Sequence, residues 1–296
     1  MKLKRILVKH EGNLALIIGN GVNRYGTSGN LRSWDAIVKK LAKRHSITYK
    51  PSEITSISLT EFYDLLVLQS NNISDTILRH EFCELISNWH PNRQHKIIAR
   101  WAKFNMSPIL TTNFDNNFGL AVECDLCKNA LDKFSDYYPW GNFFGIKDNI
   151  NPCNNFAIWH INGMQNYMRS LRLGLSHYMG SVQRVRGWLH SGNNRLFAGS
   201  NQYSWAGANT WLQIVFHMPL LIIGIGLNQE EVFLRWLLIE RAKYHHKFPK
   251  LKQPAWYVYA KSENDIGKNF FMRNVGVTPC EVLSFEEIYD EKIWEC

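Results

Sequence analysis

The stretch LALIIGNGVNRYG, residues 14–26, places five apolar residues directly before Gly19-Asn20-Gly21 and then continues with Asn23. A continuous apolar run of this length is typical of a buried strand. Glycine after a strand permits positive φ or the close approach of two backbones. A single Gly-x-Gly is a weak signal, because many turns use it. The stretch therefore predicts a strand followed by either a phosphate-binding loop or an Asn-rich turn, and other segments must decide between the two.

Apolar runs of strand length recur along the chain, at residues 107–111, 156–160, 219–225, 255–259 and 280–283. Apolar residues at helical spacing lie between several of these runs, at 34–41, 77–86 and 232–240. Ser33 is positioned to cap the first of these helices. The segment SFEE, 284–287, has the pattern of a capping box in which Ser284 and Glu287 start a short helix. This alternation predicts an α/β fold, a doubly wound Rossmann-like parallel sheet with helices on both faces.

We expect one domain over residues 1–296, because the sequence contains no repeat, low-complexity tract or Pro/Ser-rich linker. Any second lobe must then be inserted into the first domain. We place a helical insertion at approximately 28–105 and a helical segment at 165–217.

The net charge of +9 is spread along the chain, and no known nucleic-acid-binding motif accompanies it, so direct nucleic-acid binding is not predicted. The apolar run Ile6–Val8 is too short for a signal peptide, and the most apolar window, 218–227, is about half of a membrane span. We therefore expect a cytoplasmic protein with no membrane partner. Only Cys124 and Cys127 have a metal-ligand spacing, and without a second pair we expect free thiols and no metal.

Polar and glycine-rich segments follow four of the predicted strands. They are GNGVN at 19–23, TNFD at 112–115, HINGM at 160–164 and GIGLNQEE at 224–231. In a parallel sheet, ligands bind at the carboxyl ends of the strands. The sequence therefore predicts one ligand site built from these four segments.

These segments resemble the motifs of sirtuins and SIR2-like proteins, in the same order along the chain. GNGVN is similar to their Gly-Ala-Gly-x-Ser loop, TTNFD at 111–115 to Thr-Gln-Asn-Ile-Asp, and WHING at 159–163 to the catalytic His-Gly. IIGIGLNQEE at 222–231 resembles a strand end of the bacterial SIR2-like branch. The resemblance spans roughly residues 13–260, although its motifs are short.

The resemblance implies NAD as the substrate and assigns binding roles to eight residues. The first loop would lie against the NAD phosphates and ribose, with Gly19 and Gly21 allowing backbone N–H groups to approach the pyrophosphate. Asn20 and Asn23 stand where the family has Ala and Ser. Asp115 would be a structural or nicotinamide-side contact. Close to the adenosine side or the ribose we expect Gly224, Gly226 and Asn228.

The resemblance also implies two catalytic residues. Asn113 would orient the nicotinamide ribose and the attacking water, and His160 would act as general base, a role that suits imidazole because it titrates near neutral pH. Other interpretations stay open from the residues alone. Asn113 and Asp115 also suit a helix start, His160 also suits a buried core position, and Asn228 also suits a helix cap.

The chain lacks the four-cysteine zinc ribbon of classical sirtuins, and YGTSGNLRSW at 25–34 replaces their substrate-clamping segment. It is more similar to the SIR2-like NAD hydrolases of bacterial antiphage defence. These enzymes deplete NAD by releasing nicotinamide and ADP-ribose. Two alternatives remain, a non-catalytic subunit that binds NAD or ADP-ribose and a zinc-free NAD-dependent protein deacylase. Because the catalytic domain takes up about 250 residues, we expect no sensor domain and control by a protein partner or by homo-oligomerisation.

Overall fold

The computed structural model describes residues 2–26, 32–69, 74–129, 140–199, 202–229 and 231–295. Several parts of the predicted features lie outside the described residues. They are residues 28–31 and 70–73 of the helical insertion, residues 200–201 of the helical segment, and Glu230 of the GIGLNQEE motif.

An eight-stranded mixed sheet forms the centre of the molecule, in the order β3-β4-β5-β2-β1-β6-β7-β8. Its strands are β1 Ala15–Ile18, β2 Ile109–Thr111, β3 Asp125–Lys128, β4 Asn142–Gly145, β5 Ile158–His160, β6 Leu220–Ile223, β7 Ala255–Ala260 and β8 Thr278–Val282. Strands β5, β2, β1, β6, β7 and β8 are parallel, and β3 and β4 add an antiparallel edge. The six parallel strands are the six predicted apolar runs, so the α/β class with a mostly parallel sheet is confirmed. The β3–β4 pair was not predicted.

The order of the parallel strands decides where a ligand site is expected. The chain builds β1, β2 and β5 outward in one direction and then returns to the other side of β1 to build β6, β7 and β8. This is the strand order of a doubly wound dinucleotide-binding fold. The order reverses between β1 and β6, and connections to opposite faces leave a crevice at the carboxyl ends of these two strands.

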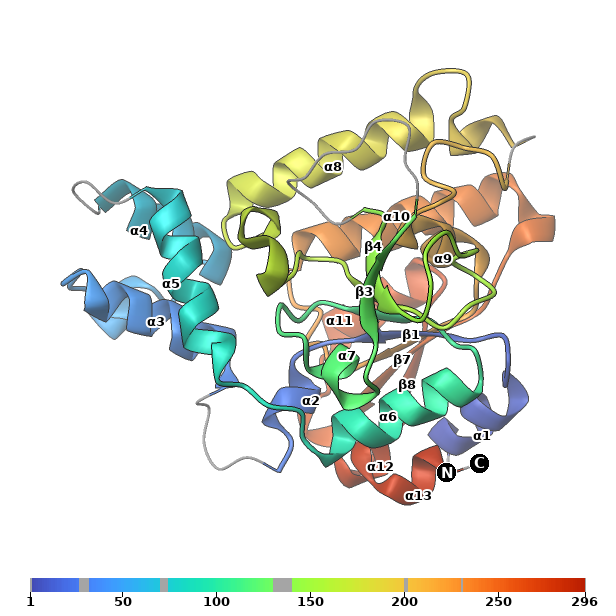
Figure 1. Ribbon diagram of the computed structural model, residues 1–296, viewed down its shortest axis with the longest axis horizontal. Helices are drawn as coiled ribbons and strands as arrows, with labels where there is room; N and C mark the ends of the chain where they lie inside the picture. The colour runs from blue at the N-terminus through green and yellow to red at the C-terminus, as the bar shows by residue number, and fades with distance from the viewer. Residues whose placement is uncertain are drawn as a thin grey trace.

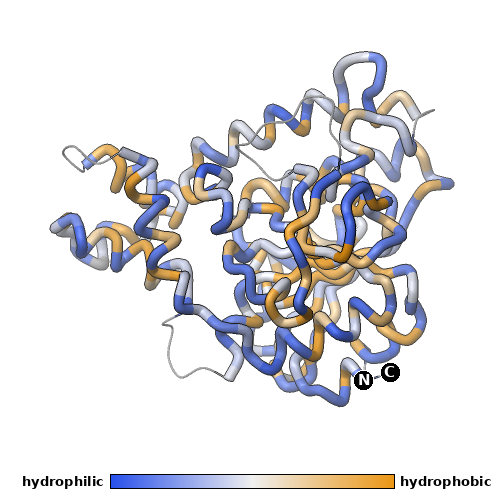
Figure 2. Tube along the Cα trace, viewed as in Figure 1, coloured by the Kyte–Doolittle hydropathy of each residue, from blue (hydrophilic) through white to orange (hydrophobic). Residues whose placement is uncertain are grey.

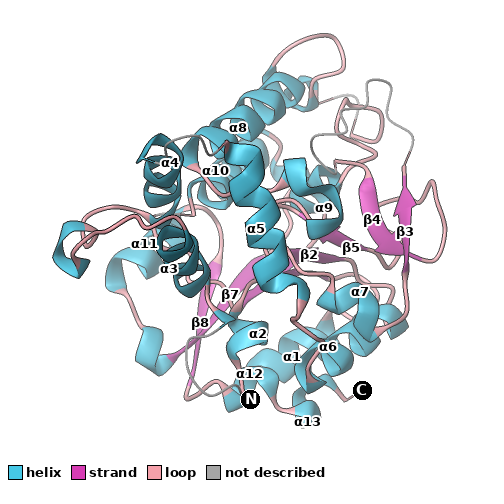
Figure 3. Ribbon diagram, turned by 60° about the vertical axis from the view of Figure 1, so that its left-hand side comes forward, coloured by secondary structure: helices cyan, strands magenta, loops and turns pink. Residues whose placement is uncertain are grey.

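Helices cover both faces of the sheet (Figures 1 and 3). One face packs against α1 Lys2–Lys9, α6 Arg93–Phe104, α7 Asn117–Ala121, α12 Glu286–Tyr289 and α13 Glu291–Trp294, and the other against α8 Leu175–His190, α9 Trp211–His217, α10 Val232–Lys247 and α11 Ile266–Asn274. Each face has its own hydrophobic core. In β1, Leu16 and Ile18 belong to the core on the α1 and α6 side and Ile17 to the core on the α8 and α10 side, as the two-residue period of a strand requires. Figure 2 shows the resulting apolar centre. None of the described helices combines the length and apolar character needed to cross a bilayer.

A helical lobe projects from the side of the sheet layers (Figure 1). It consists of α3 Trp34–Arg44, α4 Leu59–Gln69 and α5 Asp75–Ser87, which pack around a core of their own. The Ser33 side chain accepts a 3.1 Å hydrogen bond from the Ala36 N–H, which confirms the predicted cap of α3. Helix α6, which also falls within the predicted insertion, packs against α7 and α13 instead. Phe114, which follows β2, is buried in the core of the lobe and so joins the lobe to the sheet edge.

The short helix predicted at SFEE is present as α12, but it begins differently. Phe285 is its N-cap and makes no side-chain capping bond. Only a main-chain bond of 3.3 Å joins the Glu287 N–H to the Ser284 carbonyl. The helix is therefore confirmed and its predicted capping box is wrong.

Candidate functional site

A cavity of about 920 Å³ opens at the carboxyl edge of the sheet, beside the point where the strand order reverses. We call it the central cavity. Its wall includes residues that follow β1, β2, β5 and β6, namely Asn20, Gly21, Thr112, Asn162, Gly224, Gly226 and Asn228. The volume is within the range typical of small-molecule and cofactor sites. The structure thus brings residues of all four predicted segments to one cavity. TNFD and HINGM contribute one residue each, Thr112 and Asn162.

Glycines allow the loops after β1 and β6 to pack against each other. The Gly19 N–H donates to the Ile223 carbonyl at 3.1 Å, and the Gly21 N–H donates to the Gly224 carbonyl at 2.9 Å. A Cβ at residue 19 would lie 2.6 Å from the Gly224 oxygen, and a Cβ at residue 21 would lie 2.8 Å from the Gly224 Cα. Only glycine fits both positions. The two N–H groups that we expected to approach the pyrophosphate are therefore engaged within the protein.

Hydrogen bonds within the protein occupy the carbonyls of the loop 224–228. Its first four carbonyls accept hydrogen bonds from Gly21 N–H at 2.9 Å, the Tyr257 hydroxyl at 3.1 Å, Lys268 Nζ at 2.8 Å and Arg235 Nη1 at 2.8 Å. In a trans peptide the next N–H points opposite to the carbonyl. Among the described residues no acceptor bonds the N–H groups of residues 225–228, and all four residues line the cavity. These amides form a row of donors suited to an anion.

Asn23 and Asp115 form part of a buried polar cluster. Asn23 Nδ2 donates to Asp115 Oδ2 at 2.8 Å, and Asn117 donates its N–H to Asp115 Oδ1 at 3.1 Å and its Nδ2 to Asn23 Oδ1 at 3.2 Å. Desolvation by burial raises the pKa of Asp115, although the hydrogen bond from Asn23 opposes this shift. Neither Asn23 nor Asp115 lines the central cavity. Their bonds hold helix α2, Gly21–Arg24, against the end of β2.

Asn113 and His160 lie behind the cavity wall, each fully buried. Asn113 Nδ2 donates to the Gly19 carbonyl at 3.3 Å, and His160 Nε2 donates to the Asp115 carbonyl at 3.0 Å. Within the described chain, Asn113 Oδ1 and His160 Nδ1 have no hydrogen-bond partner. Burial lowers the pKa of His160 to about 4, so the imidazole is neutral and its lone pair is on Nδ1. Neither residue lines the cavity, but Thr112 and Asn162, their near neighbours in sequence, do.

The remaining predicted residues lie on the rim. Asn20 Nδ2 donates to the Arg32 carbonyl at 2.7 Å and Asn20 Oδ1 accepts from Asn23 Nδ2 at 3.0 Å, so its amide joins the first loop to the start of the helical lobe. Gly226 and Asn228 are exposed at the cavity mouth. Asn228 does not cap α10 with its side chain. Its main-chain carbonyl accepts a 3.0 Å bond from the Glu231 N–H instead.

Tyr289 of α12 is a site residue that the sequence did not indicate. It lines the central cavity, is 1% exposed, and its hydroxyl has no partner among the described residues. A Cβ at Gly21 would lie 2.6 Å from that hydroxyl, so the phenol reaches the junction of the two glycine loops. A buried hydroxyl without a partner is costly, and a ligand in the cavity would satisfy it. No local sequence pattern places residue 289 at this edge, because only the path of the chain after β8 brings it there.

Four carboxylates line the central cavity together with Arg24, namely Asp35, Glu231, Glu263 and Glu286. Such side chains suit hydroxyl groups of a ribose. Cys124 and Cys127 are free thiols on or beside the edge strand β3. In the part of the chain that the structure describes, no group of three or more His, Cys, Asp or Glu side chains is arranged to hold a metal.

No protein-family model and no curated protein matches this chain. The resemblance to the SIR2-like family therefore rests on the short motifs described above.

Proposed function

We propose that the protein binds NAD in the central cavity and hydrolyses the bond between nicotinamide and ribose. The observation that carries this proposal is the glycine-only contact between the loops after β1 and β6. It lies where the strand order reverses, beside a cavity of about 920 Å³. Doubly wound folds bind dinucleotides at this position. The resemblance to SIR2-like motifs supports NAD as this dinucleotide.

The cavity suggests a pose for NAD. The diphosphate would accept hydrogen bonds from the N–H groups of residues 225–228. The adenosine ribose would lie toward Glu263 and Tyr289, and the nicotinamide end toward Thr112 and Asn162. Each part of the dinucleotide would then meet chemistry that suits it, amide donors for phosphate and a carboxylate for a diol.

The reaction would use Asn113 and His160 as its catalytic residues. Nicotinamide leaves with the electrons of its bond to C1′, and a water oxygen forms the new bond at C1′ of the cationic ribose. His160 Nδ1 would take the water proton, and Asn113 Oδ1 would accept the other O–H and orient the water. The two unpartnered acceptors fit such a molecule, which brings two donors. Thr112 and Asn162 would have to move to admit it.

The need to move Thr112 and Asn162 would let the protein regulate NAD hydrolysis. An enzyme that depletes NAD must stay inactive until it is needed, and catalytic groups behind the cavity wall are inactive until that wall opens. We propose that a protein partner or self-assembly opens it, and that the protein acts as a cytoplasmic NAD-depleting effector in antiphage defence.

A second function is favoured by the position of His160. Because this side chain is completely buried and does not line the cavity, the protein could bind NAD or ADP-ribose without cleaving it, as a regulatory subunit.

Nicotinamide release from NAD separates the two functions. Once a candidate partner or self-assembly has activated the protein, chromatography should detect nicotinamide with the wild type, and His160→Ala or Asn113→Ala should lower its rate about 100-fold or more. The matched control is His246→Ala, which removes an exposed imidazole at the end of α10. Retention of ADP-ribose without nicotinamide release, even after mixing with candidate partners, would support the binding subunit instead.

A further inference from the structure

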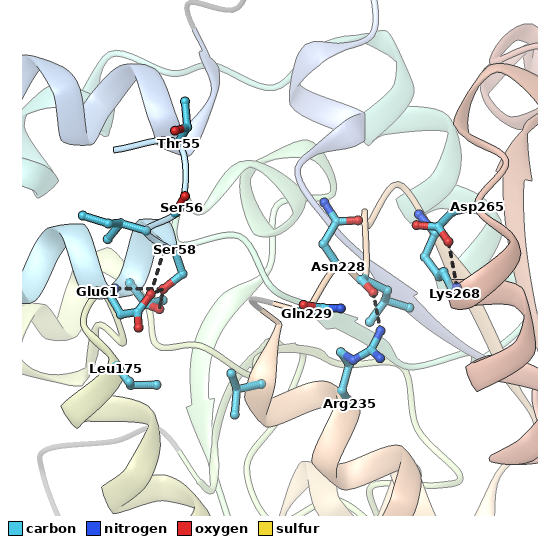
Figure 4. A pocket seen from close by; sticks show the side chains of 15 residues that line it. Thr55, Ser56, Ser58, Glu61, Leu175, Asn228, Gln229, Arg235, Asp265 and Lys268 are labelled. Atoms are coloured by element: carbon cyan, nitrogen blue, oxygen red, sulfur yellow. Dashed lines mark hydrogen bonds between the residues drawn. The ribbon is translucent and has the colours of Figure 1, made fainter. Parts of the chain in front are cut away.

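A second cavity of about 720 Å³ lies between the helical lobe and the starts of α10 and α11 (Figure 4). We call it the side cavity. Thr55, Ser56 and Ser58 line it from the lobe, and Arg235 and Lys268 line it from the sheet domain. It shares Thr60, Leu227 and Asn228 with the central cavity, so the loop after β6 separates the two.

Two cations on the wall of the side cavity form no ion pair with the described residues. Lys268 is only 9% exposed, and its Nζ donates to the Gly226 carbonyl at 2.8 Å. Arg235 Nη1 donates to the Leu227 carbonyl at 2.8 Å, and its guanidinium lies 3.9 Å from the ring centre of Phe271. Each therefore keeps further N–H donors at the cavity, although burial lowers the pKa of Arg235 and the charge of Asp265 on the same wall raises it.

Both carboxylates that line the side cavity accept main-chain hydrogen bonds at helix starts. Asp265 Oδ1 caps α11 by accepting a 2.9 Å bond from the Lys268 N–H, and Glu61 Oε2 accepts a 2.8 Å bond from the Ser58 N–H at the start of α4. The helix ends that these carboxylates cap partly offset their charge. Opposite the cations, the lobe contributes only hydroxyls beside Glu61 and Ile57. Cations facing hydroxyl groups match a phosphorylated small molecule.

We propose that the side cavity is a regulatory site for a phosphorylated small molecule, held by Arg235 and Lys268. The same two side chains hold the carbonyls of Gly226 and Leu227, whose loop presents its N–H groups to the central cavity. An anion that uses the spare donors orders both side chains without displacing these carbonyls. It therefore fixes the loop in its binding conformation, and the two sites bind their ligands with positive coupling.

Calorimetry with inorganic pyrophosphate tests the site. The wild type should bind it, and Arg235→Gln and Lys268→Met should each raise the Kd at least tenfold. Thermal unfolding is recorded for both variants because Lys268 is buried, and the less buried Arg235 gives the decisive result. Lys261→Met is the control for net charge, since Lys261 is exposed and lines neither cavity. Equal Kd values for Arg235→Gln and the wild type would overturn the site.

Coupling is measured by titrating ADP-ribose with and without saturating pyrophosphate. We expect ADP-ribose to bind at least fivefold more tightly with pyrophosphate in the wild type and equally in Arg235→Gln. An unchanged or weaker affinity in the wild type would overturn the coupling, and weakening would place pyrophosphate in the central cavity as a competitor. The coupling rests on the proposed nucleotide site, but pyrophosphate binding does not. Pyrophosphate binding without NAD cleavage, even after mixing with candidate partners, would therefore contradict the proposed hydrolysis and leave the side cavity site intact.

Discussion

The Gly21 N–H donates a 2.9 Å hydrogen bond to the Gly224 carbonyl and thereby joins the loops that end β1 and β6. These two residues are 203 positions apart in sequence, yet neither has room for a side chain at the contact. The contact forms one wall of the central cavity and lies next to the Tyr289 hydroxyl.

Gly21→Ala should destabilise the protein and abolish nucleotide binding. Its Cβ would lie 2.8 Å from the Gly224 Cα, and backbone must shift to relieve the overlap. We expect the free energy of unfolding to fall by about 1–3 kcal/mol, measured by denaturant titration. Gly187→Ala in α8 is the matched control because open space surrounds that position. It should stabilise the helix by up to about 1 kcal/mol. Equal stability of the two variants would contradict the tight loop contact.

Tyr289→Phe should weaken ligand binding without weakening the fold. The substitution removes only a buried hydroxyl that has no partner among the described residues, so the melting temperature should stay the same or rise. If the hydroxyl binds the nucleotide, the Kd for ADP-ribose should rise about fivefold to tenfold, which corresponds to about 1–1.4 kcal/mol. An unchanged Kd would place the ligand away from the glycine junction.

Glu263 should make the site prefer NAD to NADP. Glu263 and Tyr289 both line the central cavity, and the pKa of Tyr289 is raised first by burial and then by the charge of Glu263. A carboxylate suits a ribose 2′-hydroxyl and repels a 2′-phosphate. We expect ADP-ribose to bind at least about tenfold more tightly than its 2′-phosphate, and Glu263→Gln to narrow the difference. Glu287→Gln, which changes a carboxylate of α12 that does not line the central cavity, should leave it unchanged. Equal preference in both variants would remove Glu263 from the ribose site.

Acid should destabilise the protein through its buried histidines. Burial lowers the pKa of His160 to about 4 and that of His95 to about 3, below the ordinary value of 6.5. Between pH 6.5 and about 4 the unfolded imidazoles bind protons that the folded ones do not. Stability is therefore complete above pH 6.5 and falls as the pH drops, by up to about 1.4 kcal/mol per pH unit for each histidine.

The contribution of His160 can be isolated by measuring unfolding free energies from pH 7.5 to 5. His160→Gln should reduce the slope below pH 6.5, whereas His246→Gln, at an exposed position, should not. Equal slopes below pH 6.5 for His160→Gln and the wild type would contradict the burial of His160.

The sequence predicts the sheet well because strands buried on both faces have continuous apolar runs, as in LALII at 14–18 and LLII at 220–223. The sequence did not predict the β3–β4 pair because β3, DLCK, is mostly exposed and has no continuous apolar run. Loop contacts are harder to foresee. The pattern at Gly19 and Gly21 indicates close backbone approach, but not that the neighbouring backbone would be the β6 loop.

Site residues from distant parts of the chain are predicted least well. The motif at His160 predicts a strand end but not the burial of the imidazole, since burial depends on packing from β2 and β4. Tyr289 and the side cavity have no local signal at all. They form only when the chain after β8 and the helical lobe fold against the carboxyl edge.

A crystal structure of the protein with ADP-ribose tests the central claim most directly. The account predicts the diphosphate within hydrogen-bonding distance of the N–H groups of residues 225–228, the adenosine ribose beside Glu263 and Tyr289, and the other ribose toward Thr112 and Asn162. Density for ADP-ribose elsewhere on the molecule, or a central cavity that stays empty at saturating ligand, would contradict it.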